Sequence, residues 1–166
     1  MKKTITTFFM LICSVFVFAQ QADDAATTNK WIETYEKLNT AKDWNSMLSQ
    51  AESCKAEVPN WEFVYYYEGL ANFNLKNYQP AVAAFDKFIE KNTATPAAYL
   101  YRANSYLEMK EADFAIRDYE TYLQTNPNDV AVMLNKAEAR MIKKDYANYI
   151  NELTAVLAIE PTNVGA

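Results

Sequence analysis

Apolar side chains recur at helical spacing along most of the chain. Between residues 96 and 109 they follow one another at intervals of three and four, as in Tyr99, Ala103 and Tyr106. A second stripe of this kind runs over residues 115–123, after a short polar turn. Asn126-Pro127-Asn128-Asp129 then stops the pattern, because proline cannot continue a helix and aspartate favours the start of the next one. The pattern predicts two helices joined by a tight turn.

The same pattern returns at a fixed offset of 34 residues. Four segments align without insertion, at 28–61, 62–95, 96–129 and 130–163. A lysine stands at the same turn position in each segment, as Lys42, Lys76, Lys110 and Lys144. Proline recurs near the segment ends, at Pro59, Pro127 and Pro161. The sequence therefore predicts four helix–turn–helix repeats with eight helices.

The period and the residues resemble the tetratricopeptide repeat, whose pattern is W-x2-L-G-x2-Y, then A-x3-F, then P. The third segment matches best, through Tyr99, Ala103, Tyr106, Ala115, Tyr119 and Pro127. The first and fourth segments diverge, as terminal repeats do when one face lacks a neighbour. The resemblance covers residues 28–163 and implies an all-α, right-handed solenoid of four 34-residue repeats.

Small residues occupy the position where the two helices of a repeat are expected to cross. They are Gly69, Ala103 and Ala137, and a small side chain there lets the helix axes approach closely. Cys54 also falls at a packed position of the repeat. We expect a buried, inert thiol there, the alternative being a disulfide between two chains.

The first nineteen residues form a separate segment. Lys2 and Lys3 precede an almost unbroken apolar run over 5–18, and Val17-Phe18-Ala19 suits a signal peptidase. We expect a signal peptide over 1–19 that is cleaved after Ala19, the alternative being an uncleaved anchor. A lipid attachment at Cys13 is disfavoured, because bulky Ile12 precedes it. The expected organisation is then a leader over 20–27, the repeat domain over 28–163 and a tail over 164–166, in a periplasmic or secreted protein.

Composition and charge exclude several kinds of function. The chain has no histidine and only two glycines, which excludes a Ser-His-Asp triad, His-ligated zinc and a phosphate-binding glycine loop. Without Lys2 and Lys3, 14 basic residues stand against 21 acidic residues, a net charge of −7. Nucleic acids and anionic membranes both require clustered basic residues. We expect no enzyme activity, no cofactor or metal, and no nucleic-acid or membrane partner for the mature form.

The resemblance also implies where a partner binds, because the first helices of tetratricopeptide repeats line a concave groove. Counting positions within each repeat gives the expected groove residues: Tyr66, Tyr67, Leu70, Phe73, Leu100, Tyr101, Asn104, Leu107, Leu134, Asn135, Glu138 and Met141. An exposed apolar and aromatic strip usually marks an interaction site. The alternative, left open for Phe73 and Leu107 in particular, is that the curvature of the solenoid closes over these side chains.

Asn104 and Asn135 match the two asparagines of the clamp with which some family members grip a peptide carboxylate. Leu100 replaces the first lysine of that clamp, and its remaining basic residues have no counterpart. The resemblance therefore implies no carboxylate specificity. Either the two amides hold the backbone of an extended peptide, or they are simply solvated.

The last expected helix, over about 147–159, carries apolar residues that include Leu153 and Val156. We expect these two to lack a partner within the chain and to form an assembly face for self-association or for another protein.

Two alternative functions follow from the sequence. The first is a scaffold in the bacterial envelope that binds a peptide or protein in its groove. The second is a structural or oligomeric subunit that uses its C-terminal helix face.

Overall fold

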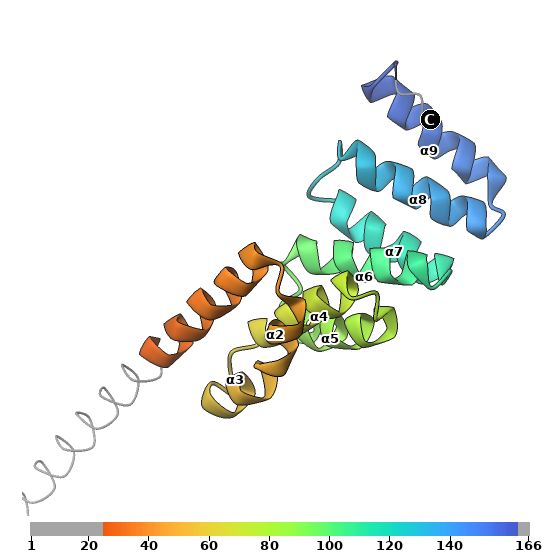
Figure 1. The fold of residues 1–166 in the computed structure, drawn as a ribbon. Helices are drawn as coiled ribbons and strands as arrows, with labels where there is room; N and C mark the ends of the chain where they lie inside the picture. The colour runs from red at the N-terminus through yellow and green to blue at the C-terminus, as the bar shows by residue number, and fades with distance from the viewer. Residues whose placement is uncertain (1–24, 163–166) are drawn as a thin grey trace, which may run out of the picture. The chain divides into compact units, whose positions relative to one another are not determined.

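The computed structural model describes residues 25–162, which are helical between short turns, as predicted (Figure 1). The expected signal peptide over 1–19 and the tail over 164–166 lie outside the described residues. The chain divides into two compact units, Met1–Trp61 and Glu62–Ala166.

The first unit contains a helix over residues 25–41, followed by α2 (Trp44–Ser49) and α3 (Ala51–Glu57). The predicted second helix of the first repeat is thus divided at Gln50. Trp31 and Tyr35 pack with their ring centroids 6.0 Å apart. Cys54 is buried with 0% of its surface exposed, as predicted for a packed thiol.

The second unit is a stack of three helix pairs. Its helices are α4 (Phe63–Asn74), α5 (Tyr78–Lys91), α6 (Pro96–Glu108), α7 (Ala112–Leu123), α8 (Val130–Ile142) and α9 (Tyr146–Ile159). Each helix packs on the next, and α6 also contacts both α4 and α8 directly (Figure 1). The first helices of successive repeats therefore form one continuous layer of a helical solenoid, as the repeat period predicted.

The four recurring lysines end the first helix of each repeat in a left-handed backbone conformation. Over residues 25–162, the positive φ angles of non-glycine residues are those of Lys42, Lys76, Lys110 and Lys144, at 55°, 62°, 63° and 62°. In the third repeat the Lys110 N–H donates to the Leu107 carbonyl at 2.9 Å, and the Glu111 N–H donates to the Tyr106 carbonyl at 2.8 Å. This bond pair is the Schellman motif, in which glycine usually takes the left-handed position.

The two helices of the second repeat cross closely at Gly69. A β-carbon added there would lie 2.7 Å from ring atoms of Phe85, which is fully buried. The equivalent residues Ala103 and Ala137 are 0% and 1% exposed. The predicted role of these small residues at the helix crossing is therefore confirmed.

A buried ion network joins three helices of the second unit. Arg102 on α6 donates to Asp118 on α7 through Nε at 2.6 Å and through a terminal nitrogen at 2.8 Å. Its other terminal nitrogen donates to Asp86 on α5 at 2.7 Å. The next repeat carries the equivalent pair Lys136–Glu152, with its charged atoms 2.9 Å apart. These pairs hold neighbouring helices in one register.

Replacing Gly69 with alanine should destabilise the protein by about 1–3 kcal/mol, because the new methyl group overpacks against Phe85. Urea unfolding measures the effect. The same change in a Phe85→Leu background should cost clearly less, since the smaller side chain leaves room. If Gly69→Ala instead raises stability, as helix propensity alone favours, the close contact does not exist.

Replacing Lys110 with glycine should stabilise the protein by roughly 0.5–1 kcal/mol. The change removes the cost of a left-handed L-residue, although glycine also gains entropy in the unfolded chain. Thermal unfolding of this variant, compared with Lys110→Ala as a control, checks the sign. A glycine variant no more stable than the alanine variant would contradict the left-handed assignment.

Candidate functional site

The layer formed by α4, α6 and α8 carries all the groove residues expected from the sequence. Most of them are half-buried, namely Tyr66, Tyr67, Phe73, Leu100, Tyr101, Asn104, Leu134 and Asn135. Glu138 and Met141 are exposed, and Met141 shows 40% of its surface. This layer therefore presents an accessible surface of mixed aromatic, aliphatic and amide character.

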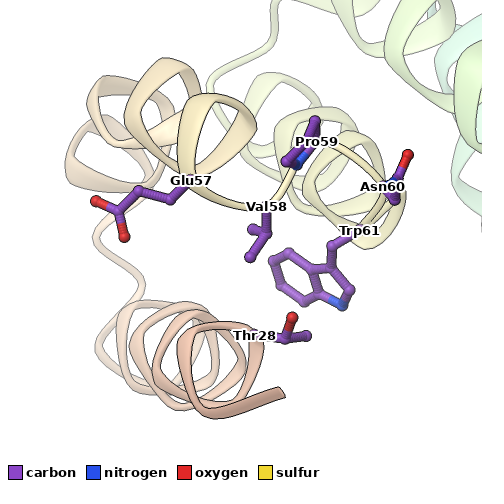
Figure 2. Close-up of a pocket in the computed structure, with 6 residues that line it drawn as sticks. All are labelled: Thr28, Glu57, Val58, Pro59, Asn60 and Trp61. Atoms are coloured by element: carbon purple, nitrogen blue, oxygen red, sulfur yellow. The ribbon is translucent and has the colours of Figure 1, made fainter. Parts of the chain in front are cut away.

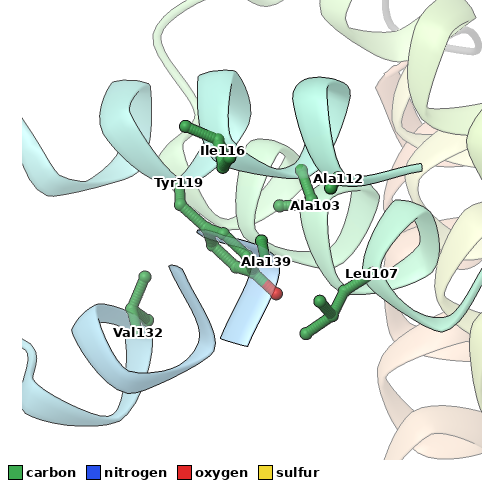
Figure 3. Packing of buried hydrophobic residues seen from close by; sticks show 8 residues of the cluster. Ala103, Leu107, Ala112, Ile116, Tyr119, Val132 and Ala139 are labelled. Atoms are coloured by element: carbon green, nitrogen blue, oxygen red, sulfur yellow. The ribbon is translucent and has the colours of Figure 1, made fainter. Parts of the chain in front are cut away.

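Leu70 and Leu107 are buried, at 6% and 8% exposed, so the expectation of exposure is wrong for Leu70. Leu107 belongs to a core cluster with Ala103, Ala112 and Tyr119 (Figure 3). Successive first helices contact one another directly, so the side chains at this level are covered. Leu107 therefore packs in the core, the alternative left open by its sequence position.

Half-buried aromatic rings of α4 and α6 pack against one another and against buried rings of α5. Tyr66 has its ring centroid 5.7 Å from that of Tyr67 and 5.4 Å from that of Phe88. Tyr101 lies 5.5 Å from Phe73 and stacks on Phe85 at 6.1 Å. Burial disfavours the phenolate and, with smaller effects from Tyr101 and Tyr67, raises the pKa of Tyr66 to about 12.

The Asn104 side-chain oxygen accepts hydrogen bonds from a tyrosine of α7 and from the second asparagine. The ring of Tyr119 is buried among α6, α7 and α8 (Figure 3), and its hydroxyl donates to Asn104 Oδ1 at 2.7 Å. Asn135 Nδ2 donates to the same oxygen at 3.4 Å. Sequence reasoning placed Tyr119 in the repeat pattern and missed this hydrogen bond. Among the described residues, none accepts a hydrogen bond from the Asn104 side-chain N–H groups, which leaves them for a ligand.

A hollow of about 280 Å³ lies between α8 and α9 at the end of the layer. Its lining residues are Leu134, Ala137, Glu138, Met141, Tyr149 and Leu153. Three of them, Leu134, Glu138 and Met141, are groove residues expected from the sequence, so the hollow belongs to the candidate site. Its size and apolar walls suit one large aliphatic or aromatic side chain.

The assembly face predicted at Leu153 and Val156 is wrong, because these two residues lie on the inward side of α9. Val156 is fully buried, and Leu153 is half-buried and lines the hollow. Both point toward α8 and not away from it. The outward side of α9 instead carries Tyr146, Ile150 and Leu157, which are 55%, 61% and 39% exposed.

The first unit has a larger hollow, of about 410 Å³, that sequence reasoning did not find (Figure 2). It is lined by Thr28 and by residues 57–61, the segment around Pro59 that follows α3. Its carboxylate, Glu57, accepts hydrogen bonds from Trp31 at 3.1 Å and from Lys30 at 3.2 Å. Glu57 is therefore already engaged in contacts within its own unit.

Residues 25–162 contain no group of three or more histidine, cysteine, aspartate or glutamate residues placed to hold a metal ion. No helix in this part of the chain has the length and apolar character needed to cross a membrane.

Comparisons with known proteins agree with this geometry. A family model described as Tetratricopeptide repeat matches residues 63–93. The chain is 24% identical over 144 residues to Hsp70-Hsp90 organizing protein 2 of Arabidopsis thaliana, covering 87% of this chain and 25% of the relative. It is 27% identical over 99 residues to human (Homo sapiens) Sperm-associated antigen 1, covering 60% of this chain and 11% of the relative. The chain thus matches only a quarter or less of each relative's length.

Two solved structures share the fold. A crystal structure of MamA protein superposes with a TM-score of 0.71 at 22% identity, covering 78% of this chain and 70% of MamA. MamA 41-end from Desulfovibrio magneticus RS-1 gives a TM-score of 0.70 at 15% identity, covering 80% of this chain and 75% of that one.

The fold and the accessible layer formed by α4, α6 and α8, called the inner layer below, define a helical-repeat scaffold. Scaffolds of this kind generally bind proteins and carry no catalytic site. Within that class, residues 63–93 match the tetratricopeptide repeat, and the helix pairs on both sides of this segment follow the same 34-residue period.

The raised pKa of Tyr66 predicts a loss of stability at alkaline pH. The unfolded chain ionises this tyrosine near pH 10, whereas the folded chain holds the proton to about 12. The stability that the folded chain gains from holding this proton is therefore complete below pH 10 and is lost as the pH rises toward 12. Urea unfolding across this range should show a shallower decline for Tyr66→Phe than for the wild type. Parallel curves for the two proteins would contradict the assignment.

Proposed function

We propose that this protein is an exported adaptor that binds an extended segment of a partner protein along the layer formed by α4, α6 and α8. The observation that carries the proposal is the hollow lined by Leu134 and Met141 of α8, the helix that forms one layer with α4 and α6 and their half-buried tyrosines. Rigid aromatic side chains are efficient anchors, because they bury a large area and lose few rotatable bonds.

The polar groups suggest how such a segment is held. The Asn104 side-chain N–H groups can donate to a peptide carbonyl, while a large apolar side chain fills the hollow lined by Leu134 and Met141. The clamp lysine is replaced by Leu100, so a terminal carboxylate is not required. Exposed Glu138 at the edge of the hollow favours a neutral or basic residue next to the apolar one.

The cellular location is proposed from the sequence. The two N-terminal lysines, the apolar run and the Val-Phe-Ala triplet support export to a bacterial periplasm or beyond. The name of the plant relative describes a protein that organises two others, which supports an adaptor role here. The partner is then a protein of the same compartment.

The proposal is tested by selecting binders to the purified protein from a random peptide library. Selected peptides should share a large apolar residue followed or preceded by a basic one. Met141→Ala should weaken their binding by about tenfold, since truncating a central apolar contact costs on the order of 1.4 kcal/mol. Glu138→Lys should reverse the preference for a neighbouring basic residue.

Phe114→Ala provides a matched control for Met141→Ala. Phe114 is an apolar side chain of similar exposure, 43% against 40%, but it lies on the outer helix α7. Its truncation should leave peptide affinity unchanged. Equal weakening by the two variants, or peptides that bind without regard to Met141 and Glu138, would contradict binding in the groove.

A further inference from the structure

The outward side of α9 is equivalent to a surface that accepts another helix elsewhere in the same unit. Thirty-four residues before Tyr146, Ile150 and Leu157 stand Ala112, Ile116 and Leu123 of α7. Ala112 and Ile116 are 8% and 6% exposed. All three belong to or pack against a core cluster that includes Val132 and Ala139 of α8. The α9 residues keep this apolar character and remain exposed.

Where the second helix of one repeat meets the first helix of the next, an acidic residue pairs with a basic one. On α9 these acidic positions carry uncharged residues. Where α5 meets α6, Asp86 pairs with Arg102 at 2.7 Å, and where α7 meets α8, Glu120 pairs with Arg140 at 2.9 Å. The equivalent position on α9 is Thr154. A second acidic residue of α7, Asp113, pairs with Lys143, and its α9 counterpart is Ala147.

The lack of acidic residues on the outward side of α9 limits which helices can pack there. The charged residue of α9 is Glu152, which is already paired with Lys136 at 2.9 Å. A helix with basic residues placed like those of α6 or α8 would bury them against α9 without acidic partners, which is costly. The matching surface is therefore an apolar helix face without charge.

The first helix of a second copy does not provide such a face. At the positions equivalent to Val132 and Ala139, residues 25–41 carry Lys30 and Lys37, and both are exposed. Stacking the first helix of one copy on α9 of another would press these two lysines onto apolar side chains. Head-to-tail association is thus disfavoured by desolvation of charge.

We propose that α9 packs against α9 of a second copy about a two-fold axis. Ala147, Ile150, Thr154 and Leu157 follow one another at intervals of three, four and three residues, the spacing of helices that pack side by side. In an antiparallel pair, Ile150 of one copy meets Leu157 of the other, and Thr154 lies near the axis. A helix of 14 residues is only about 21 Å long, so the contact is small and the dimer dissociates on dilution.

Sedimentation velocity and light scattering of the purified protein, from micromolar to near-millimolar concentration, test the proposal. The mass should rise from that of one chain and level at that of two. Ile150→Glu should remain monomeric with an unchanged circular dichroism melt, since this side chain is 61% exposed in the single chain. Ile159→Glu is the matched control, because it lies on the opposite side of α9 with 41% exposure, and it should dimerise like the wild type.

A Thr154→Cys variant tests the two-fold arrangement. Mild oxidation at high concentration should link two chains through this position, whereas Asn148→Cys, away from the axis, should cross-link poorly. A monomer at every concentration would overturn the proposal and leave α9 to a helix of another protein. A mass that grows beyond two chains, or a dimer that survives Ile150→Glu, would overturn it as well. Met141→Ala should dimerise normally, so failure of peptide binding and failure of dimerisation are distinguishable.

Discussion

The close crossing of the two helices within each repeat is the constraint on which the rest of the second unit depends. A small residue on the first helix faces a large one on the second, in the pairs Gly69–Phe85, Ala103–Tyr119 and Ala137–Leu153. This packing determines how far each second-helix side chain reaches into the inner layer. It brings the Tyr119 hydroxyl to Asn104 and places Leu153 in the wall of the hollow. The candidate site is therefore built by the same contacts that hold the helices together.

Ion pairs fix the position of each repeat relative to the next one in the second unit. Arg102 is 9% exposed and Asp118 is 1% exposed, and Asp86 completes a link across α5, α6 and α7. A buried pair adds little net stability, because desolvation offsets the attraction. Loss of one partner is nevertheless costly, so the network penalises any slip between these helices. The inner layer can then present its tyrosines and asparagines at fixed spacing.

The sequence predicted the helix pairs, their period and the small residues at the crossings, because these follow from spacing within one repeat. It did not distinguish Leu70 and Leu107, which are buried, from their accessible neighbours, since that depends on contact between successive first helices. The phase of α9 was misjudged for a similar reason. Its amphipathic pattern is weak, with apolar residues on both sides, and only packing against α8 shows that Val156 faces inward. The recurring lysines marked the turns, whereas their left-handed backbone emerged only from the structure.

The central claim is that the inner layer of the second unit is the binding surface. Methyl NMR of the methionines tests it most directly, using a peptide selected on the protein. Met141 lines the hollow and is 40% exposed, whereas Met133 on the same helix and Met47 in the first unit are 7% and 0% exposed. Saturating peptide should shift the Met141 methyl resonance strongly and leave those of Met133 and Met47 nearly unchanged. An unchanged Met141 resonance in the peptide-saturated protein would contradict the account.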